Sequence, residues 1–124
     1  MISYDYMGEN LLLEEFSGEV NEYEFLDIKK SELAQTDYPK IRGIVMDFRK
    51  ARIGFSKKKL QQLIEFFKRY KIIFENKSIA ILTKTMEQLQ FGYLLRDQLK
   101  DHPVSIQIEQ FSSKNDAYKW IKDK

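Results

Sequence analysis

Residues 41–70 read IRGIVMDFRKARIGFSKKKLQQLIEFFKRY, and this segment is the most informative part of the sequence. An apolar run at 44–46 lies within a predicted strand over 41–48, and such a run is typical of a strand covered on both faces. A basic loop is predicted at 49–52, and Ser56 is a favoured residue for the start of a helix. The stretch therefore predicts a strand, a loop and a helix in succession, which is the unit of an open α/β sheet.

Strands and helices are predicted to alternate along the rest of the chain. Alternating apolar residues predict a hairpin over 2–17, which Gly18 ends, and Asn21 with Glu24 forms a capping pattern for a helix over 22–35. The other expected elements are a strand at 78–83, a helix from about 85, where Thr85 and Gln88 form a capping pair, to 100, a strand at 104–110 and a last helix capped by Ser113 with Asp116. The expected fold is a single α/β domain over residues 1–124, with a mixed five-stranded sheet, four helices and the order ββαβαβαβα.

Individual residues in these elements carry further expectations. The helix over 22–35 is expected to bury Phe25, Ile28 and Leu33, and the strand over 104–110 is expected to lie at an edge of the sheet because only one of its faces is apolar. His102 is expected to be exposed in a turn.

Composition excludes several classes of function. The chain of 124 residues contains no cysteine and one histidine, so disulfides, thiol catalysis and histidine-rich metal sites are excluded, and no metal is expected. No phosphate-binding glycine loop and no nucleic-acid-binding module is present, so neither a cofactor nor nucleic acid is expected. The N-terminus lacks the features of a signal peptide, and no run is long enough to cross a membrane, so we expect a cytoplasmic protein.

Charge is distributed unevenly along the chain. Residues 1–39 hold ten acids and two bases, whereas residues 40–59 hold eight bases and one acid. One interpretation is that these segments neutralise each other or face solvent separately. The other is a basic patch that meets an acidic protein or an anion. The patch would combine Arg49, Lys50 and Arg52 with the lysines at 57–59, which oppose the helix dipole and so bring no stability of their own.

Each candidate site residue also has a purely structural interpretation. Ser56 is a good helix cap, which is worth about 1 kcal/mol, but a phosphate there would be favoured by the helix dipole and by the lysines. Asp47, at the end of a central strand, can cap the following turn or pair with Arg49 or Arg52. A lone carboxylate with neither a second acid nor a histidine is a poor catalyst, so no catalytic residue is predicted.

Three short motifs resemble the STAS domains of sulfate transporters and anti-sigma-factor antagonists, in the branch also described as STAS/SEC14-like. They are Gly18-Glu19-Val20-Asn21, Val45-Met46-Asp47-Phe48-Arg49, and Phe91-Gly92-Tyr93-Leu94-Leu95-Arg96 followed by Gln110-Phe111 and 115–121. The order of elements extends this resemblance over nearly the whole chain. It implies a small bacterial protein and, in antagonists, a serine at the comparable helix start that a partner kinase phosphorylates, which here is Ser56.

We therefore expect a non-enzymatic regulatory module that binds proteins. Its partner- or anion-binding residues are predicted to be Asp47, Arg49, Lys50, Arg52, Ser56, Lys57, Lys58 and Lys59. The expected partner is a protein with an acidic surface, attracted by these cations. The alternative is a SEC14-like protein that binds a small molecule or a lipid in an apolar cavity under the helices at 22–35 and 85–100. A homodimer is compatible with the edge strand at 104–110.

Overall fold

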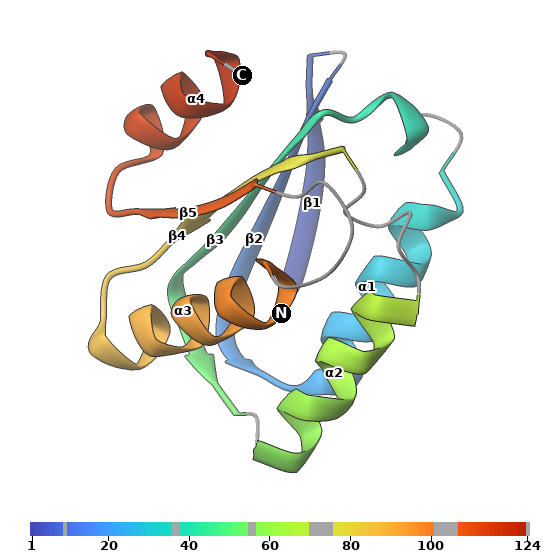
Figure 1. Cartoon of the computed structure of the whole chain (residues 1–124), viewed down its shortest axis with the longest axis vertical. Helices are drawn as coiled ribbons and strands as arrows, with labels where there is room; N and C mark the ends of the chain where they lie inside the picture. The colour runs from blue at the N-terminus through green and yellow to red at the C-terminus, as the bar shows by residue number, and fades with distance from the viewer. Residues whose placement is uncertain (9, 36–37, 55–56, 70–75, 101–106, 124) are drawn as a thin grey trace.

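One five-stranded sheet lies at the centre of the molecule, with helices on both of its faces (Figure 1). The computed structural model describes residues 1–8, 10–35, 38–54, 57–69, 76–100 and 107–123. The strands are β1 (Ile2–Met7), β2 (Leu11–Val20), β3 (Gly43–Ile53), β4 (Ser78–Leu82) and β5 (Gln107–Phe111). The helices are α1 (Glu22–Leu33), α2 (Lys57–Arg69), α3 (Met86–Lys100) and α4 (Lys114–Lys122), with a short 3₁₀ turn, η1, at Tyr38–Lys40.

The strands lie in the sheet in the same order as in the sequence. β1 pairs with β2 in antiparallel fashion, and the other neighbouring pairs are parallel. Each parallel pair is connected through a helix, as a parallel connection requires. The predicted α/β class, the mixed sheet and the order ββαβαβαβα are therefore confirmed. β5 lies at an edge, also as predicted, while 104–106 and His102 lie outside the described residues.

Two apolar layers hold the helices on the sheet. α1, α2 and α3 cover one face, and α4 covers part of the other (Figure 1). Aromatic rings fill the larger layer: the ring of Phe16 stacks on those of Phe48 and Phe25, at centroid distances of 4.2 and 5.5 Å. Phe48 also meets Phe91 of α3 edge-on at 5.2 Å. Phenylalanine rings thus occupy space between the sheet and both α1 and α3, where the lipid-binding alternative placed its cavity.

The predicted basic loop at 49–52 is wrong, because β3 continues to Ile53. The pairing with β2 shifts after Glu15–Asp47 and resumes at Ser17–Lys50, so β3 gains one residue in a bulge and then continues. Gly18, with φ +67°, stays inside β2 and does not end it. The apolar side chain of Ala51 explains the extension, since it is buried in the larger layer.

The buried face of α1 differs from the one predicted. Phe25 is buried as expected, but Ile28 and Leu33 are only half-buried. The positions that turn fully inward include Lys29 and Glu32. A helix normally turns its apolar side toward the core, so the residue types at these two positions give no signal of burial.

Local capping signals were predicted correctly. The Asn21 side chain accepts a hydrogen bond from the backbone N–H of Glu24 at 3.0 Å. At the start of α3, Thr85 and Gln88 bond each other reciprocally, with the backbone N–H of each donating to the other's side-chain oxygen at 3.1 and 3.2 Å. The backbone N–H of Asp116 donates to Ser113 Oγ at 3.4 Å. Each of these pairs spans three residues, so the sequence alone contains the whole signal.

Candidate functional site

The parallel strands β2 to β5 have their carboxyl ends on one side of the sheet, where α2, α3 and α4 begin. The candidate site lies at these strand ends. Side chains alternate along a strand, and Ala51 faces the layer under α1 to α3. Lys50 and Arg52 therefore lie on the opposite face, which α4 covers only in part. Both are exposed, and neither forms an ion pair with any described residue. We call Arg49, Lys50, Arg52 and Lys84 the cationic rim.

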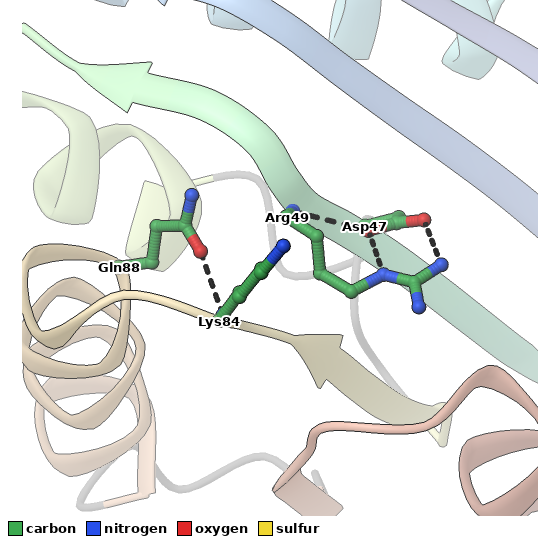
Figure 2. A network of polar contacts seen from close by, with 4 residues as sticks. All are labelled: Asp47, Arg49, Lys84 and Gln88. Atoms are coloured by element: carbon green, nitrogen blue, oxygen red, sulfur yellow. Dashed lines mark hydrogen bonds and ion pairs between the residues drawn. The ribbon is translucent and has the colours of Figure 1, made fainter.

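Asp47 and Arg49 form a bidentate ion pair at the rim (Figure 2). Arg49 Nε donates to Asp47 Oδ1 and Arg49 Nη2 to Asp47 Oδ2, both at 2.9 Å, and the Arg49 backbone N–H adds a bond to Oδ1 at 3.1 Å. The Asp47 side chain is 10% exposed and that of Arg49 33%. Burial alone would raise the pKa of Asp47, but the bonds from Arg49 outweigh it and hold this pKa below its usual value. The pair fixes the guanidinium in one orientation.

Replacing Asp47 with asparagine is expected to lower the free energy of unfolding by about 1–2 kcal/mol at pH 7, because charge-assisted bonds are lost from a mostly buried group. The depressed pKa also sets the pH dependence. The stabilisation by Asp47 is present above its unfolded pKa of about 4 and is lost as pH falls through the lower folded value. Urea denaturation between pH 7 and pH 2 measures both effects. The exposed Asp27→Asn serves as the control, and equal losses in the two variants would contradict the assignment.

Lys84 also belongs to the cationic rim, although no sequence pattern singles it out. It follows β4, is exposed, and its amino group points toward Arg49 in Figure 2. Gln88 fixes the segment between β4 and α3 that contains Lys84. Its Oε1 accepts from the backbone N–H of Lys84 at 2.7 Å, and its Nε2 donates to the carbonyl of Ala51 at 2.8 Å. The capping pattern at Thr85 predicted the helix start, but no sequence signal shows that the Gln88 amide also reaches β3.

The predicted lysines of α2 do not all join this rim. Lys59 turns to α1, where its Nζ lies 2.6 Å from Glu22 Oε1 and 5.2 Å from the centre of the Tyr23 ring. These contacts lie on the side of the sheet opposite Lys50 and Arg52. Lys58 is exposed on α2, and Lys57 begins that helix. Ser56 lies outside the described residues. The structure thus groups Asp47, Arg49, Lys50 and Arg52 and separates Lys59 from them.

A shallow hollow of about 190 Å³ lies beside the rim, on the part of the sheet that α4 leaves open. Asp47 and Lys50 form one side of it, and Ser3, Glu15 and Ser17 of the hairpin form the other. Among the described residues, no three acidic or histidine side chains are grouped so that they could hold a metal ion. None of the helices that the structure describes is long and apolar enough to cross a membrane. This face of the sheet thus carries Arg49, which Asp47 holds in place, and the exposed cations Lys50 and Arg52.

Solved structures resemble this chain over nearly its whole length. An uncharacterised protein of the DUF3478 family from Shewanella loihica PV-4, described as having a SpoIIAA-like fold, matches with a TM-score of 0.64 and 18% identity, covering 98% of this chain and 92% of its own. The chain has a SpoIIAA-like fold. The anti-sigma factor antagonist SpoIIAA itself, in its unphosphorylated form, matches with a TM-score of 0.62 and 7% identity, covering 98% of both chains. No family model and no curated protein sequence matches. The SpoIIAA-like fold confirms the STAS-like architecture expected from the sequence, and at these identities the likeness concerns the fold.

Proposed function

We propose that the protein is a non-enzymatic regulatory module that binds an acidic protein partner at the cationic rim. The observation that carries this proposal is the exposure of Lys50 and Arg52 on an open sheet face, without an ion pair to any described residue. They are two residues apart on one strand, which places them about 6–7 Å apart. Neighbouring cations at this spacing attract an acidic surface and orient it as it approaches.

The fold and the Asp47–Arg49 pair add support. SpoIIAA, which shares the fold, is an anti-sigma factor antagonist and hence a protein that acts on another protein. In this chain Asp47 holds the Arg49 guanidinium in one orientation, so part of the rim is ordered before a partner arrives, which lowers the entropic cost of binding. Phosphorylation of Ser56, partner contacts of Lys57 to Lys59, a bound lipid and a homodimer remain predictions.

Reversing the charge of the rim tests the proposal. The double variant Lys50→Glu, Arg52→Glu is expected to lose at least about 90% of the acidic proteins that the wild type captures from a native lysate, because two attractive contacts become repulsive. Capture by the wild type should also weaken as salt is added, since exposed charges are screened. Quantitative mass spectrometry of the captured proteins provides the measurement.

A matched control separates the rim from net charge. The double variant Lys30→Glu, Lys122→Glu makes the same change in charge at two exposed lysines, one on α1 and one on α4. It should capture the same proteins as the wild type. Loss of capture in both double variants would mean that overall charge, and no particular surface, governs binding. Unchanged capture by the rim variant would end the proposal.

A further inference from the structure

Three ionisable side chains are packed between α1 and β2 with no exposure to solvent. Lys29 Nζ donates to Glu14 Oε2 at 2.5 Å and lies 3.3 Å from Glu32 Oε1. All three residues have 0% of their surface exposed. Glu14 comes from the centre of β2, whereas Lys29 and Glu32 are neighbours on α1, one turn apart. The cluster thus fastens α1 to the sheet.

Its charges do not balance if every group is ionised, because two carboxylates face one ammonium. Apart from the 3.3 Å contact between Glu32 Oε1 and Lys29 Nζ, Glu14 Oε1 and both oxygens of Glu32 are buried and accept no hydrogen bond from the described residues. A carboxylate that is fully buried and shares its one nearby ammonium with a second acid usually takes up a proton instead of keeping its charge. One proton would neutralise the cluster, and it would also give Glu32 an O–H donor for Glu14.

Neighbouring elements bring no further cation close to Glu32 in the described part of the chain. Tyr6 of β1 and Tyr38 of η1 face the cluster with phenol groups. Burial, with the two acids adding to it, raises the pKa of Tyr38, so this phenol stays neutral. Lys77, which precedes β4, places its Nζ 4.9 Å over the Tyr38 ring. Lys29 is therefore the cation that acts on both acids.

We propose that the folded protein holds Glu32 in its protonated form, so that the contact between α1 and the sheet contains one bound proton. Burial raises the pKa of Glu32 to about 10, with the Glu14 carboxylate adding to this and Lys29 opposing it. Burial alone would lower the pKa of Lys29, but the two acids outweigh it and raise this pKa, so the ammonium stays charged.

The bound proton links the position of α1 to pH. In the unfolded chain Glu32 titrates near its ordinary value of 4.5, and in the folded protein near 10. Between these values the folded state binds a proton that the unfolded state does not, so the stability contributed by this group is complete below pH 4.5 and is lost as pH rises toward 10. Any event that lifts α1 from the sheet at neutral pH should release this proton.

Proton release on unfolding tests the proposal directly. When weakly buffered protein at pH 8 is unfolded with urea, the wild type should release about one proton per molecule more than Glu32→Gln, since the amide mimics the neutral acid but carries no titratable proton. Glu65→Gln, which changes an exposed acid of α2, should release as many protons as the wild type. Equal release from the wild type and Glu32→Gln would overturn the proposal.

A second measurement does not depend on the folding of the variant. In wild-type protein with ¹³C-labelled glutamate, the carboxyl carbon of Glu32 should keep the chemical shift of a protonated acid from pH 6 to pH 8. A shift of the ionised form at Glu32 at pH 7 would overturn the proposal whatever the variants do.

Discussion

Replacing Lys29 with methionine is expected to lower the free energy of unfolding by about 3–5 kcal/mol at pH 7, because it leaves buried carboxyl groups without their cation. Lys29 Nζ is the charged partner of both Glu14 and Glu32, and none of the three is exposed. Urea denaturation monitored by circular dichroism measures the loss. A protein of this size is stable by only about 5–15 kcal/mol in total, so the loss would be a large fraction of its stability.

The adjacent residue provides the control for this substitution. Lys30 is exposed on the same turn of α1, and Lys30→Met removes the same charge and adds the same side chain. Its effect should stay within about 0.5 kcal/mol. In the triple variant Glu14→Leu, Lys29→Met, Glu32→Leu, the charges are replaced by apolar groups and most of the lost stability should return. A small effect of Lys29→Met alone would mean that the ion cluster is not formed in solution.

The second large effect is expected from Phe48→Ala. The Phe48 ring lies between the rings of Phe16 and Phe91, at centroid distances of 4.2 and 5.2 Å, and it joins the sheet to α3. Truncating a fully buried phenylalanine leaves a cavity and costs about 3–5 kcal/mol. Thermal and urea unfolding should both report the loss.

Two further variants locate this effect. Phe48→Leu fills most of the space and should cost clearly less than alanine. Met86→Ala, at a position that is 68% exposed, should change stability by no more than about 0.5 kcal/mol. If Phe48→Ala lowered the free energy of unfolding as little as Met86→Ala, the Phe48 ring would not be packed in the larger layer as described.

Short-range patterns are the part of the fold that the sequence could predict. The caps at Asn21, Thr85 and Ser113 need only two residues three positions apart. The buried stripe of α2 repeats at helical spacing and includes Leu60, Leu63, Ile64 and Phe67. The two-sided burial of β3 and β4 follows from their continuous apolar runs. These features are local, so they are present in the sequence before any tertiary contact forms.

What the sequence could not predict depends on contacts between distant residues. The bulge that lengthens β3 arises from its pairing with β2, about thirty positions earlier in the chain. Lys29 can be buried because its ammonium donates a hydrogen bond to the carboxylate of Glu14, fifteen positions away. Lys59 was expected beside Arg49 and instead meets Glu22 across the α1–α2 contact. In each case the residue type suggests solvent or a turn, and a partner from another element decides otherwise.

The candidate site was predicted in part for the same reason. Asp47 and Arg49 are two positions apart, and their pairing is one of three options that the sequence offers for Asp47, beside a turn cap and a pair with Arg52. The sequence predicts a loop at Lys50 and Arg52. In the structure they lie on a strand, and alternation along that strand exposes both on one face. Lys84 follows β4, and its place near this end of β3 depends on the pairing of β4 with β3. Clusters of charge along the chain thus indicated the region, while the strand pairing determined its members.

Photo-crosslinking beside the cationic rim tests whether an acidic protein binds there. Glu19 is exposed and pairs with Arg52 across β2 and β3, so replacing Glu19 with benzoylphenylalanine puts a reactive group next to the cations and leaves all of them in place. Asp27, exposed on α1 behind the sheet, receives the same probe as a control. We expect acidic proteins to be crosslinked from position 19 and not from position 27. Crosslinking of the same proteins from position 27 alone would contradict this expectation.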